Sequence, residues 1–322
     1  MTSGDDEGEG GGGGGEEKKV KKEKLPKDQI LQKMNIPLVW MKTFDTMDTS
    51  WKEKPRSENF VLPLIHEVYN KKLEADAVDD KASNNRDDMP EFIYEHFEFK
   101  YGDKRLAEAK LFELLATVRK LHKKNETIHV FARFCHLVEP LGIQGLNFFL
   151  NAYQFGQKAE YGFVFSAKKG EQEWIDLRQV AAFHENVLLP SVQTSIATRF
   201  FRDMEEMSEM TEVSGGDVCE RLRFQSYLRY VMDAYTEQTN FLVERFQVGV
   251  GNLGEEAVKV EKVTIDHLQM FASCICKRVD PRKLSDAWKE LQQSAEIDGP
   301  HVGISLNRRI AESFIAKRIS AT

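Results

Sequence analysis

The stretch from Pro90 to Val138 decides the fold. It reads PEFIYEHFEFKYG over residues 90–102, DKRLAEAKLFELLATVRKLHKK over 103–124 and NETIHVFARFCHLV over 125–138. In the middle part the apolar residues are spaced alternately by four and three positions, which is the period of one helix face. These residues are Ala107, Leu111, Leu114, Val118 and Leu121. The spacing predicts a helix that packs against other helices along one side.

The boundaries of this stretch predict three helices joined by short turns. Pro90 is suited to the first position of a helix, where its missing N–H costs nothing. Gly102 is suited to the position just after a helix, where the left-handed conformation is common. Asp103 can then cap the next helix, over about 104–123, and a third helix covers about 127–137. Three such helices make a compact bundle.

The rest of the chain continues the helical plan. Helices are predicted over about 59–73, 142–156, 178–186, 190–211 and 217–247, and then over 262–277, 282–295 and 306–319. Residues 75–88 are polar and predict a loop. Asp217 and Glu220 resemble a capping box at the start of one helix, and Asp280-Pro281 predicts a cap for another. Tyr161–Phe165 is the best strand candidate. The expected fold class is mainly α, a helical bundle.

Composition divides the chain into four regions. Residues 1–35 form an acidic, glycine-rich tail that ends in a lysine block, and they are expected to be disordered. Residues 36–56 form an extended, tryptophan-containing arm. Residues 57–165 form the helical module, and residues 166–322 form a second helical region.

The lysine block is the first candidate binding site. Its members are Lys18, Lys19, Lys21, Lys22, Lys24 and Lys27. A solvated charge run explains such a block, and so does attachment to an acidic polymer such as nucleic acid, anionic lipid or the acidic tails of tubulin. Nuclear localisation is a third interpretation, and lysine clusters alone do not separate the three.

The arm is the second candidate. Trp40, Met41, Phe44 and Trp51 supply large apolar side chains in a segment broken by prolines, with neither helical nor strand period. Tryptophan is enriched in interface hot spots. The arm therefore packs either on this chain's own helices or on a partner, where these four residues would be the anchors.

Overall composition narrows the classes of function. The formal net charge is −7, which disfavours a nucleic-acid binder. The longest apolar runs fall short of the ~20 residues that span a bilayer, so no membrane segment is expected. Four sparse cysteines fit reduced thiols in the cytoplasm. We expect no cofactor and no metal.

Two motifs are weak indications of a nucleotide site and a metal site. Gly249–Gly254 matches G-x-G-x-x-G, but a long helix is predicted before it and two glutamates follow it, so a nucleotide-dependent enzyme is only the second alternative function. Cys274 and Cys276 are splayed by the helical period, and the chain offers no second pair for zinc. Catalytic motifs with the expected spacing are missing, so we expect no enzyme.

Three phrases share one layout. Each is predicted to be a short extended segment followed by a capping residue and a helix. The three segments are Trp174–Leu177, Thr264–His267 and Gly303–Leu306. Paired EF-hands have this layout, although a calcium loop also needs acidic ligands at alternating positions, of which only Asp298-Gly299 is a fragment. Degenerate, structural EF-hand-like helix pairs are expected over 166–322, and a calcium-responsive regulator is the first alternative function.

Part of the central stretch resembles a helical module of ciliary and flagellar axonemal proteins. The similar residues are Phe92–Gly102, Leu106–Glu108, Leu114-Leu115, Val118–Lys120 and Phe131–Phe134. Those proteins often continue into degenerate EF-hand-like segments. The resemblance covers about fifty residues and carries no catalytic motif. It implies a structural or adaptor subunit of a microtubule-based assembly, in the cytoplasm and cytoskeleton, at the axoneme of a cilium or flagellum. Other axonemal proteins, and tubulin at the lysine block, would be its partners in a larger complex.

Overall fold

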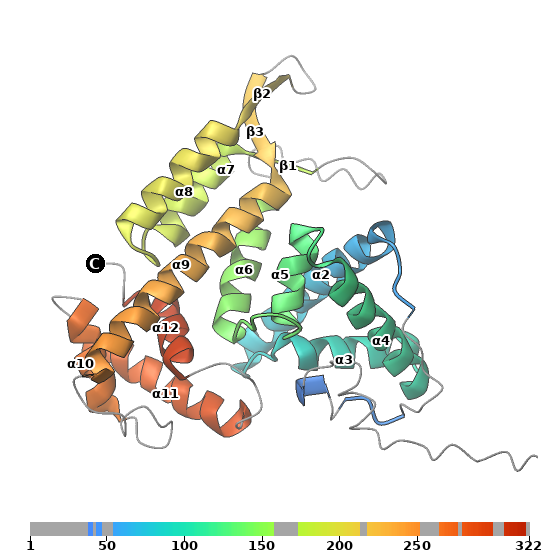
Figure 1. The fold of residues 1–322 in the computed structure, drawn as a ribbon, viewed down its shortest axis with the longest axis horizontal. Coiled ribbons are helices and arrows are strands. Elements are labelled where there is room, and N and C mark those ends of the chain that lie inside the picture. Colours follow the sequence, from blue (N-terminus) through green and yellow to red (C-terminus); the bar gives the residue numbers. More distant parts are fainter. Residues whose placement is uncertain are drawn as a thin grey trace, which may run out of the picture.

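The computed structural model describes residues 38–40, 43–46, 54–157, 173–212, 218–251, 264–275, 279–298 and 306–319. Within these ranges the chain is mainly helical, as predicted, and Figure 1 shows the arrangement. The α-helices are α2 (Glu58–Ala82), α3 (Met89–Tyr101), α4 (Lys104–Leu121), α5 (Glu126–Phe134), α6 (Ile143–Gly156), α7 (Leu177–Phe183), α8 (Thr194–Met207), α9 (Phe224–Gly251), α10 (Ile265–Ile275), α11 (Pro281–Asp298) and α12 (Leu306–Ala316).

The three predicted helices of the central stretch are present as α3, α4 and α5. Gly102 has φ +67° and ends α3, so a side chain there would be strained. Asp103 caps α4 by accepting a hydrogen bond from the Leu106 N–H at 2.7 Å. Asn125 caps α5 in the same way, accepting from the Ile128 N–H at 3.1 Å. Local capping chemistry therefore fixes the turns of this unit.

Helix α2 is longer than the sequence predicted. It runs from Glu58 to Ala82, so the predicted loop over 75–88 is wrong for its first eight residues. Its polar second half stays helical because Lys72 and Asp76, one turn apart, form a buried ion pair within it. The helix ends at Ser83, which adopts the left-handed conformation with φ 58°.

Within the described residues, three short strands form a sheet in the order β1–β3–β2, with both pairings antiparallel. They are β1 (Trp174–Asp176), β2 (Glu209–Glu212) and β3 (Val218–Arg223). Two helix predictions are wrong here. Helix α8 ends at Met207, short of residue 211, and the predicted capping residue Glu220 lies in β3 opposite Met210. Cross-strand pairing, which is non-local, overrides the local pattern.

Two of the strands continue directly into helices. Strand β1 leads into α7, with Asp176 accepting a hydrogen bond from the Arg178 N–H at 2.8 Å, as the predicted layout requires. Strand β3 leads into α9, and Ile175 lies opposite Leu222 between the two strands. The chain just before Thr264 lies outside the described residues, as do residues 303–305, and Leu306 begins α12.

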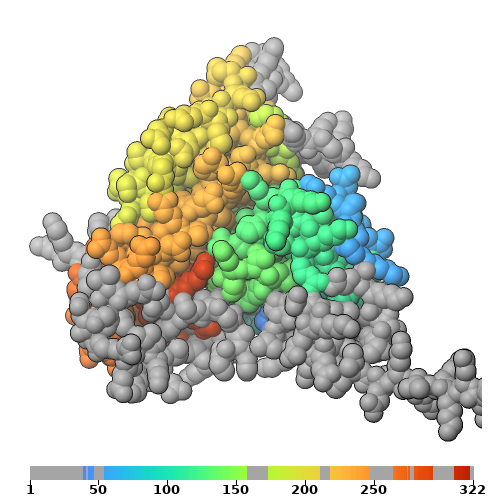
Figure 2. Space-filling view, in the orientation of Figure 1, coloured from blue at the N-terminus to red at the C-terminus, as the bar shows by residue number. Residues whose placement is uncertain are grey.

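Helix α9 joins the two predicted helical regions. It packs against α5 and α6 on one side and against α8, α10 and α12 elsewhere. In Figure 1 it runs from the sheet at the top to α10 and α12, and in Figure 2 its orange atoms lie against the green atoms of the helical module. The buried apolar residues form one cluster that includes members from both sides of residue 165. These elements therefore share one core.

Candidate functional site

The residues predicted to bind partners are only partly described. The lysine block, at residues 18–27, lies outside the described residues, as do Met41 and Trp51. The strand candidate Tyr161–Phe165 and the predicted tail over 1–35 also lie outside them. Of the predicted anchors, the structure places Trp40 and Phe44.

Trp40 and Phe44 are buried against this chain's own helices. Both side chains are 0% exposed. The indole Nε1 of Trp40 donates a hydrogen bond to the carbonyl oxygen of Cys135 at 2.9 Å. The ring of Phe44 meets that of Phe112 edge to face, with centroids 6.0 Å apart. In this structure these two side chains pack within the chain, so neither is available to a partner.

A second contact holds the same part of the arm. The backbone N–H and the hydroxyl of Thr46 both donate to Glu108 Oε2, each at 2.8 Å. Glu108 is fully buried in α4. A buried carboxylate needs such donors to offset the loss of its water shell. The arm is therefore attached by polar contacts as well as by apolar burial.

A cleft of about 450 Å³ lies between α2, α6 and the end of α12. This volume is within the range of small-molecule and peptide pockets. Most of the lining is polar. Its polar lining residues include Asp76, Asp80, Arg86, Gln144, Asn147, Asn151, Gln154, Tyr235 and Arg318.

Four side-chain amides of α6 line this cleft. They are Gln144, Asn147, Asn151 and Gln154, at spacings of three, four and three. That spacing places them in one row along a helix. Asn151 and Gln154 are exposed, and Gln144 and Asn147 are half-buried. The row presents both donors and acceptors to whatever enters the cleft.

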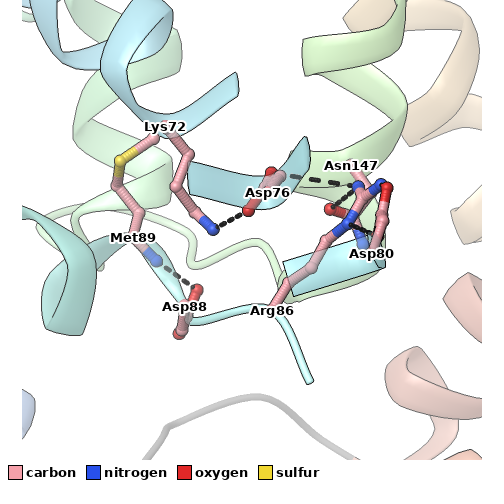
Figure 3. A network of polar contacts seen from close by, with 7 residues as sticks. All are labelled: Lys72, Asp76, Asp80, Arg86, Asp88, Met89 and Asn147. Carbon is pink, nitrogen blue, oxygen red and sulfur yellow. Dashed lines mark hydrogen bonds and ion pairs between the residues drawn. The ribbon is translucent and has the colours of Figure 1, made fainter. Parts of the chain in front are cut away.

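One wall of the cleft is a charge network, drawn in Figure 3. Lys72 pairs with Asp76 Oδ1, and both side chains are almost fully buried. Arg86 donates to both carboxylate oxygens of Asp80, at 2.9 and 2.6 Å, and to the Asn147 Oδ1 at 3.0 Å. Its Nη1 also lies 3.8 Å from Asp76 Oδ2.

The hydrogen bonds from Arg86 set the electrostatics of this wall. They lower the pKa of the Asp80 carboxyl below its usual value. The same contacts raise the pKa of Arg86, although partial burial opposes the shift. Arg86 therefore stabilises the ionised form of Asp80 on this wall, and Asp76 and Asp79 also act on Arg86 electrostatically.

The floor of the cleft is aromatic. The rings of Phe148 and Tyr235 lie with centroids 4.9 Å apart. Tyr235 is 1% exposed, and within the described residues its hydroxyl has no hydrogen-bond partner. Burial raises the pKa of Tyr235 well above its usual value, so the group is a neutral phenol at pH 7. The charged groups that act on this phenol are Glu312, Arg308 and Arg133, which do not line the cleft.

Arg318 stands on the opposite rim, just after α12. It has φ 54°, in the left-handed region, and it is exposed. Its Nη2 donates to the Asn186 carbonyl oxygen at 3.5 Å, and it forms no ion pair with any residue that the structure describes. The charged residues that line the cleft are Asp76, Asp80, Arg86 and Arg318, so the lining carries no net charge.

A buried acid lies below this region. Glu312 on α12 is 2% exposed, and its Oε1 lies 3.5 Å from Arg308 Nε and from the Gly142 N–H. Burial raises the pKa of Glu312 to about 7, with Arg308 and Arg133 opposing the shift. This group therefore titrates near neutral pH and ties α12 to the start of α6.

The glycine motif and the cysteine pair lie partly within helices and partly outside the described residues. Gly249–Gly251 form the end of α9, and residues up to Gly254 lie outside the described part. Cys274 falls within α10, and Cys276 is not described. Across the described ranges, histidine, cysteine and acidic side chains form no group of three that could hold a metal ion. None of the described helices is long and apolar enough to cross a membrane.

The cleft was not predicted from the sequence. The row at residues 144, 147, 151 and 154 was a visible signal, because four amides on one helix face interrupt an otherwise apolar segment. Arg318 and Tyr235 carried no local signal, since tertiary packing alone brings them to α6.

Comparisons with known proteins identify no relative. The chain matches no family model, no curated protein and no solved structure.

Proposed function

We propose that this protein is a non-enzymatic structural or adaptor subunit of a microtubule-based assembly, the axoneme of a cilium or flagellum. Its partners are then other axonemal proteins and tubulin, and its location is the cytoskeleton. Two sequence features support the proposal, namely the resemblance of Phe92–Phe134 to an axonemal module and the lysine block at residues 18–27.

The attachment of the arm is the structural observation that supports the proposal best. Lys27 precedes Trp40 by 13 residues. Because Trp40 is held at Cys135, the lysine block is tethered to a rigid helical body. A linker of that length reaches at most about 45 Å. The lysine block therefore stays within that distance of Trp40, so an acidic surface that binds the block is held near the helical body.

Co-sedimentation with microtubules tests the tether. We compare the full chain, a chain lacking residues 1–35, and full chains in which the six lysines are changed to glutamine or to arginine. The glutamine variant and the truncation should lose most of the binding, and the arginine variant should keep it because its charge is unchanged. Raising the salt should weaken the wild type. Equal sedimentation of all four forms would remove tubulin binding by the block from the proposal.

The cellular location is tested separately. A tagged full chain should concentrate along the axoneme of ciliated cells. A diffuse cytoplasmic distribution in cells with intact cilia would contradict the axonemal assignment, whatever the sedimentation result.

One observation favours a second function, a calcium-responsive regulator of the EF-hand type. Strands β1 and β3 pair side by side, and each leads directly into a helix, which is the layout of paired EF-hands. Calorimetry with calcium up to about 1 mM spans the affinity range of most EF-hand sites. A heat of binding would favour the regulator, and a flat titration would eliminate it.

A further inference from the structure

We propose that the basic surface at the end of α4 binds a short acidic segment of a partner polypeptide. This surface, the basic patch, consists of Lys120, His122, Lys123 and Lys124 at the end of α4 and of His129 on α5. The inference goes beyond the proposed function, because it concerns the folded helical body and depends neither on the lysine block nor on the axoneme.

The backbone after α4 brings the three lysines of the basic patch together. Helix α4 ends at Leu121, and the N–H groups of Lys124 and Asn125 both donate to the Leu121 carbonyl oxygen, at 2.8 and 3.2 Å. This turn continues the helical path, so Lys123 and Lys124 follow Lys120 at the spacings of three and four that make neighbours on one helix face. All three side chains are exposed.

Helix α5 adds to the same surface. The rings of His122 and His129 lie with their centroids 5.8 Å apart, and His129 is exposed. Burial lowers the pKa of His122, and the positive groups of His129 and Lys123 lower it further. Like charges disfavour the protonation of a histidine only when they are close to it. The end of α4 and the start of α5 therefore present one surface of positive potential.

The three lysines form no ion pair within the described ranges of the chain. Residues 114–125 contain no aspartate or glutamate. The carboxylates around this stretch have other partners: Glu58 accepts a hydrogen bond from Asn125, Glu113 pairs with Arg56, and Glu126 pairs with Arg229. The negative end of the α4 dipole is equivalent to only about half a charge. Most of the positive charge of the basic patch is therefore available to an anion from outside.

The charge of the whole protein narrows the class of anion. The formal net charge is −7. A nucleic-acid duplex or an anionic membrane brings a large negative surface against the protein, and the rest of the protein repels that surface. A short, flexible segment approaches the basic patch alone, and charges more than about 8 Å away from it are largely screened at physiological salt. The basic patch therefore favours a short acidic segment over an extended anionic surface.

The spacing of the lysines suggests a pattern for the segment. At 1.5 Å per residue, Lys120 and Lys124 are about 6 Å apart along the helix axis. Side chains on one side of an extended peptide recur every second residue, which is about 6.6 Å. A segment with a carboxylate at every second position thus places successive carboxylates beside successive lysines. The ammonium groups are point charges on flexible stems, so this match need not be exact.

Fluorescence anisotropy with defined peptides tests the proposal. The probes are three fluorescein-labelled hexapeptides in which alanine alternates with glutamate, glutamine or lysine. The protein is the full chain with the six lysines of residues 18–27 changed to glutamine, which removes the charge of the lysine block. The glutamate peptide should bind more tightly than the other two, and raising the salt should weaken its binding.

Variants of the basic patch then locate the binding. Lys120→Gln, Lys123→Gln and Lys124→Gln in one chain should weaken the binding of the glutamate peptide about tenfold, since each exposed charge pair contributes roughly twofold. Changing the same three residues to arginine should keep the binding, because the charge is unchanged.

A matched control separates the basic patch from the net charge. Lys71→Gln, Lys81→Gln and Lys283→Gln in one chain change three exposed lysines of α2 and α11, and they alter the net charge by the same amount. Because these lysines do not belong to the basic patch, the control should bind the glutamate peptide within about twofold of the unchanged background.

Chemical cross-linking locates the contact in the wild-type full chain. A carbodiimide joins the carboxylates of the glutamate peptide to lysine amines in contact with them, and mass spectrometry identifies these lysines. Lys120, Lys123 and Lys124 should be joined to the peptide more often than Lys71, Lys81 and Lys283.

Three results would overturn the proposal. The first is no binding of the glutamate peptide at millimolar concentration, and the second is equal binding by the glutamine variant of the basic patch and its control. The third is binding of a short DNA duplex or of phosphatidylserine vesicles that depends on the three lysines and is tighter than that of the peptide. Circular dichroism should show that each variant is folded, because the changed residues are exposed. The lysine block is already neutral in the anisotropy experiment, so a failure of the microtubule experiment leaves this test unaffected.

Discussion

Trp40 donates its indole N–H to the carbonyl oxygen of Cys135 at 2.9 Å, across 95 residues of sequence. The bond joins the arm to the end of α5 in a fully buried place. Trp40→Phe keeps most of the apolar contact but leaves the carbonyl without this donor, and it should lower the free energy of unfolding by about 1–3 kcal/mol. Urea denaturation of the full chain measures the change.

A matched aromatic on the surface gives the control. Phe99 is 90% exposed, so Phe99→Ala should change the free energy of unfolding by less than about 0.5 kcal/mol. If Trp40→Phe were equally harmless, the arm would not be held at Cys135 in solution.

The buried pair of Lys72 and Asp76 gives the second prediction. Lys72→Met leaves Asp76 with only Arg86 at 3.8 Å, and it should cost about 3 kcal/mol because the carboxylate stays out of water. Lys72→Met combined with Asp76→Leu should recover much of the loss, since both buried charges are then gone. A double-mutant cycle in urea measures the coupling.

An exposed pair on the same helix controls for charge alone. Lys71 and Glu74 form an ion pair on the surface of α2, with side chains 49% and 65% exposed. Lys71→Met should change the stability by less than about 1 kcal/mol. A similar loss in the two lysine variants would mean that the burial of Lys72 is not what makes it important.

Glu312 makes stability depend on pH. Its pKa is about 7 in the folded protein, against the usual value of 4.5, so the folded state holds a proton that the unfolded state has released between these values. Stability from this group is therefore greatest below pH 4.5 and falls as the pH rises to about 7. The full difference between the two pKa values corresponds to about 3 kcal/mol.

Glu312→Gln should remove this contribution, because glutamine cannot ionise. The free energies of unfolding of wild type and variant, measured at pH 5, 6, 7 and 8, should differ by an amount that changes steadily up to pH 7 and then levels off. Subtracting the two curves cancels the pH-dependent contribution of histidines such as His66, because it is the same in both proteins. Burial lowers the pKa of His66 to about 4. Parallel curves would show that Glu312 does not titrate in this range.

Gly156 allows α6 and α9 to approach closely. A Cβ added there would overlap with Phe224 Cε2 and would lie 3.3 Å from Ile175 Cδ1. Gly156→Ala should therefore cost about 1–3 kcal/mol through overpacking. Adding Phe224→Leu should make the alanine less harmful, because the smaller side chain leaves room. Purely additive losses in thermal unfolding would argue against this contact.

The central helices were predictable because their signals are local. Apolar spacing marked α4, Gly102 marked the end of α3, and Asp280 caps α11 by accepting from the Arg282 N–H at 2.9 Å, as its sequence predicted. Each of these effects acts within one or two turns of helix.

The predictions were wrong where contacts between residues distant in sequence determine the local structure. Glu220 belongs to a pattern that also starts helices, and only pairing with β1 and β2 makes it part of a strand. The second half of α2 looks like a loop until Lys72 and Asp76 are seen to be buried together. The cleft was missed for the same reason, because Arg318 and Asn151 are far apart in sequence.

The length of helix α9 also fixes a distance within the protein. It runs for 28 residues without a break, from the sheet to the helices at the far end of the molecule. At 1.5 Å per residue such a rod is about 42 Å long. Anything held at its two ends is kept at a set spacing, and inserting one turn would lengthen that spacing by about 5.4 Å. The length of α9 thus sets the distance between the sheet at one end and the helices packed at the other.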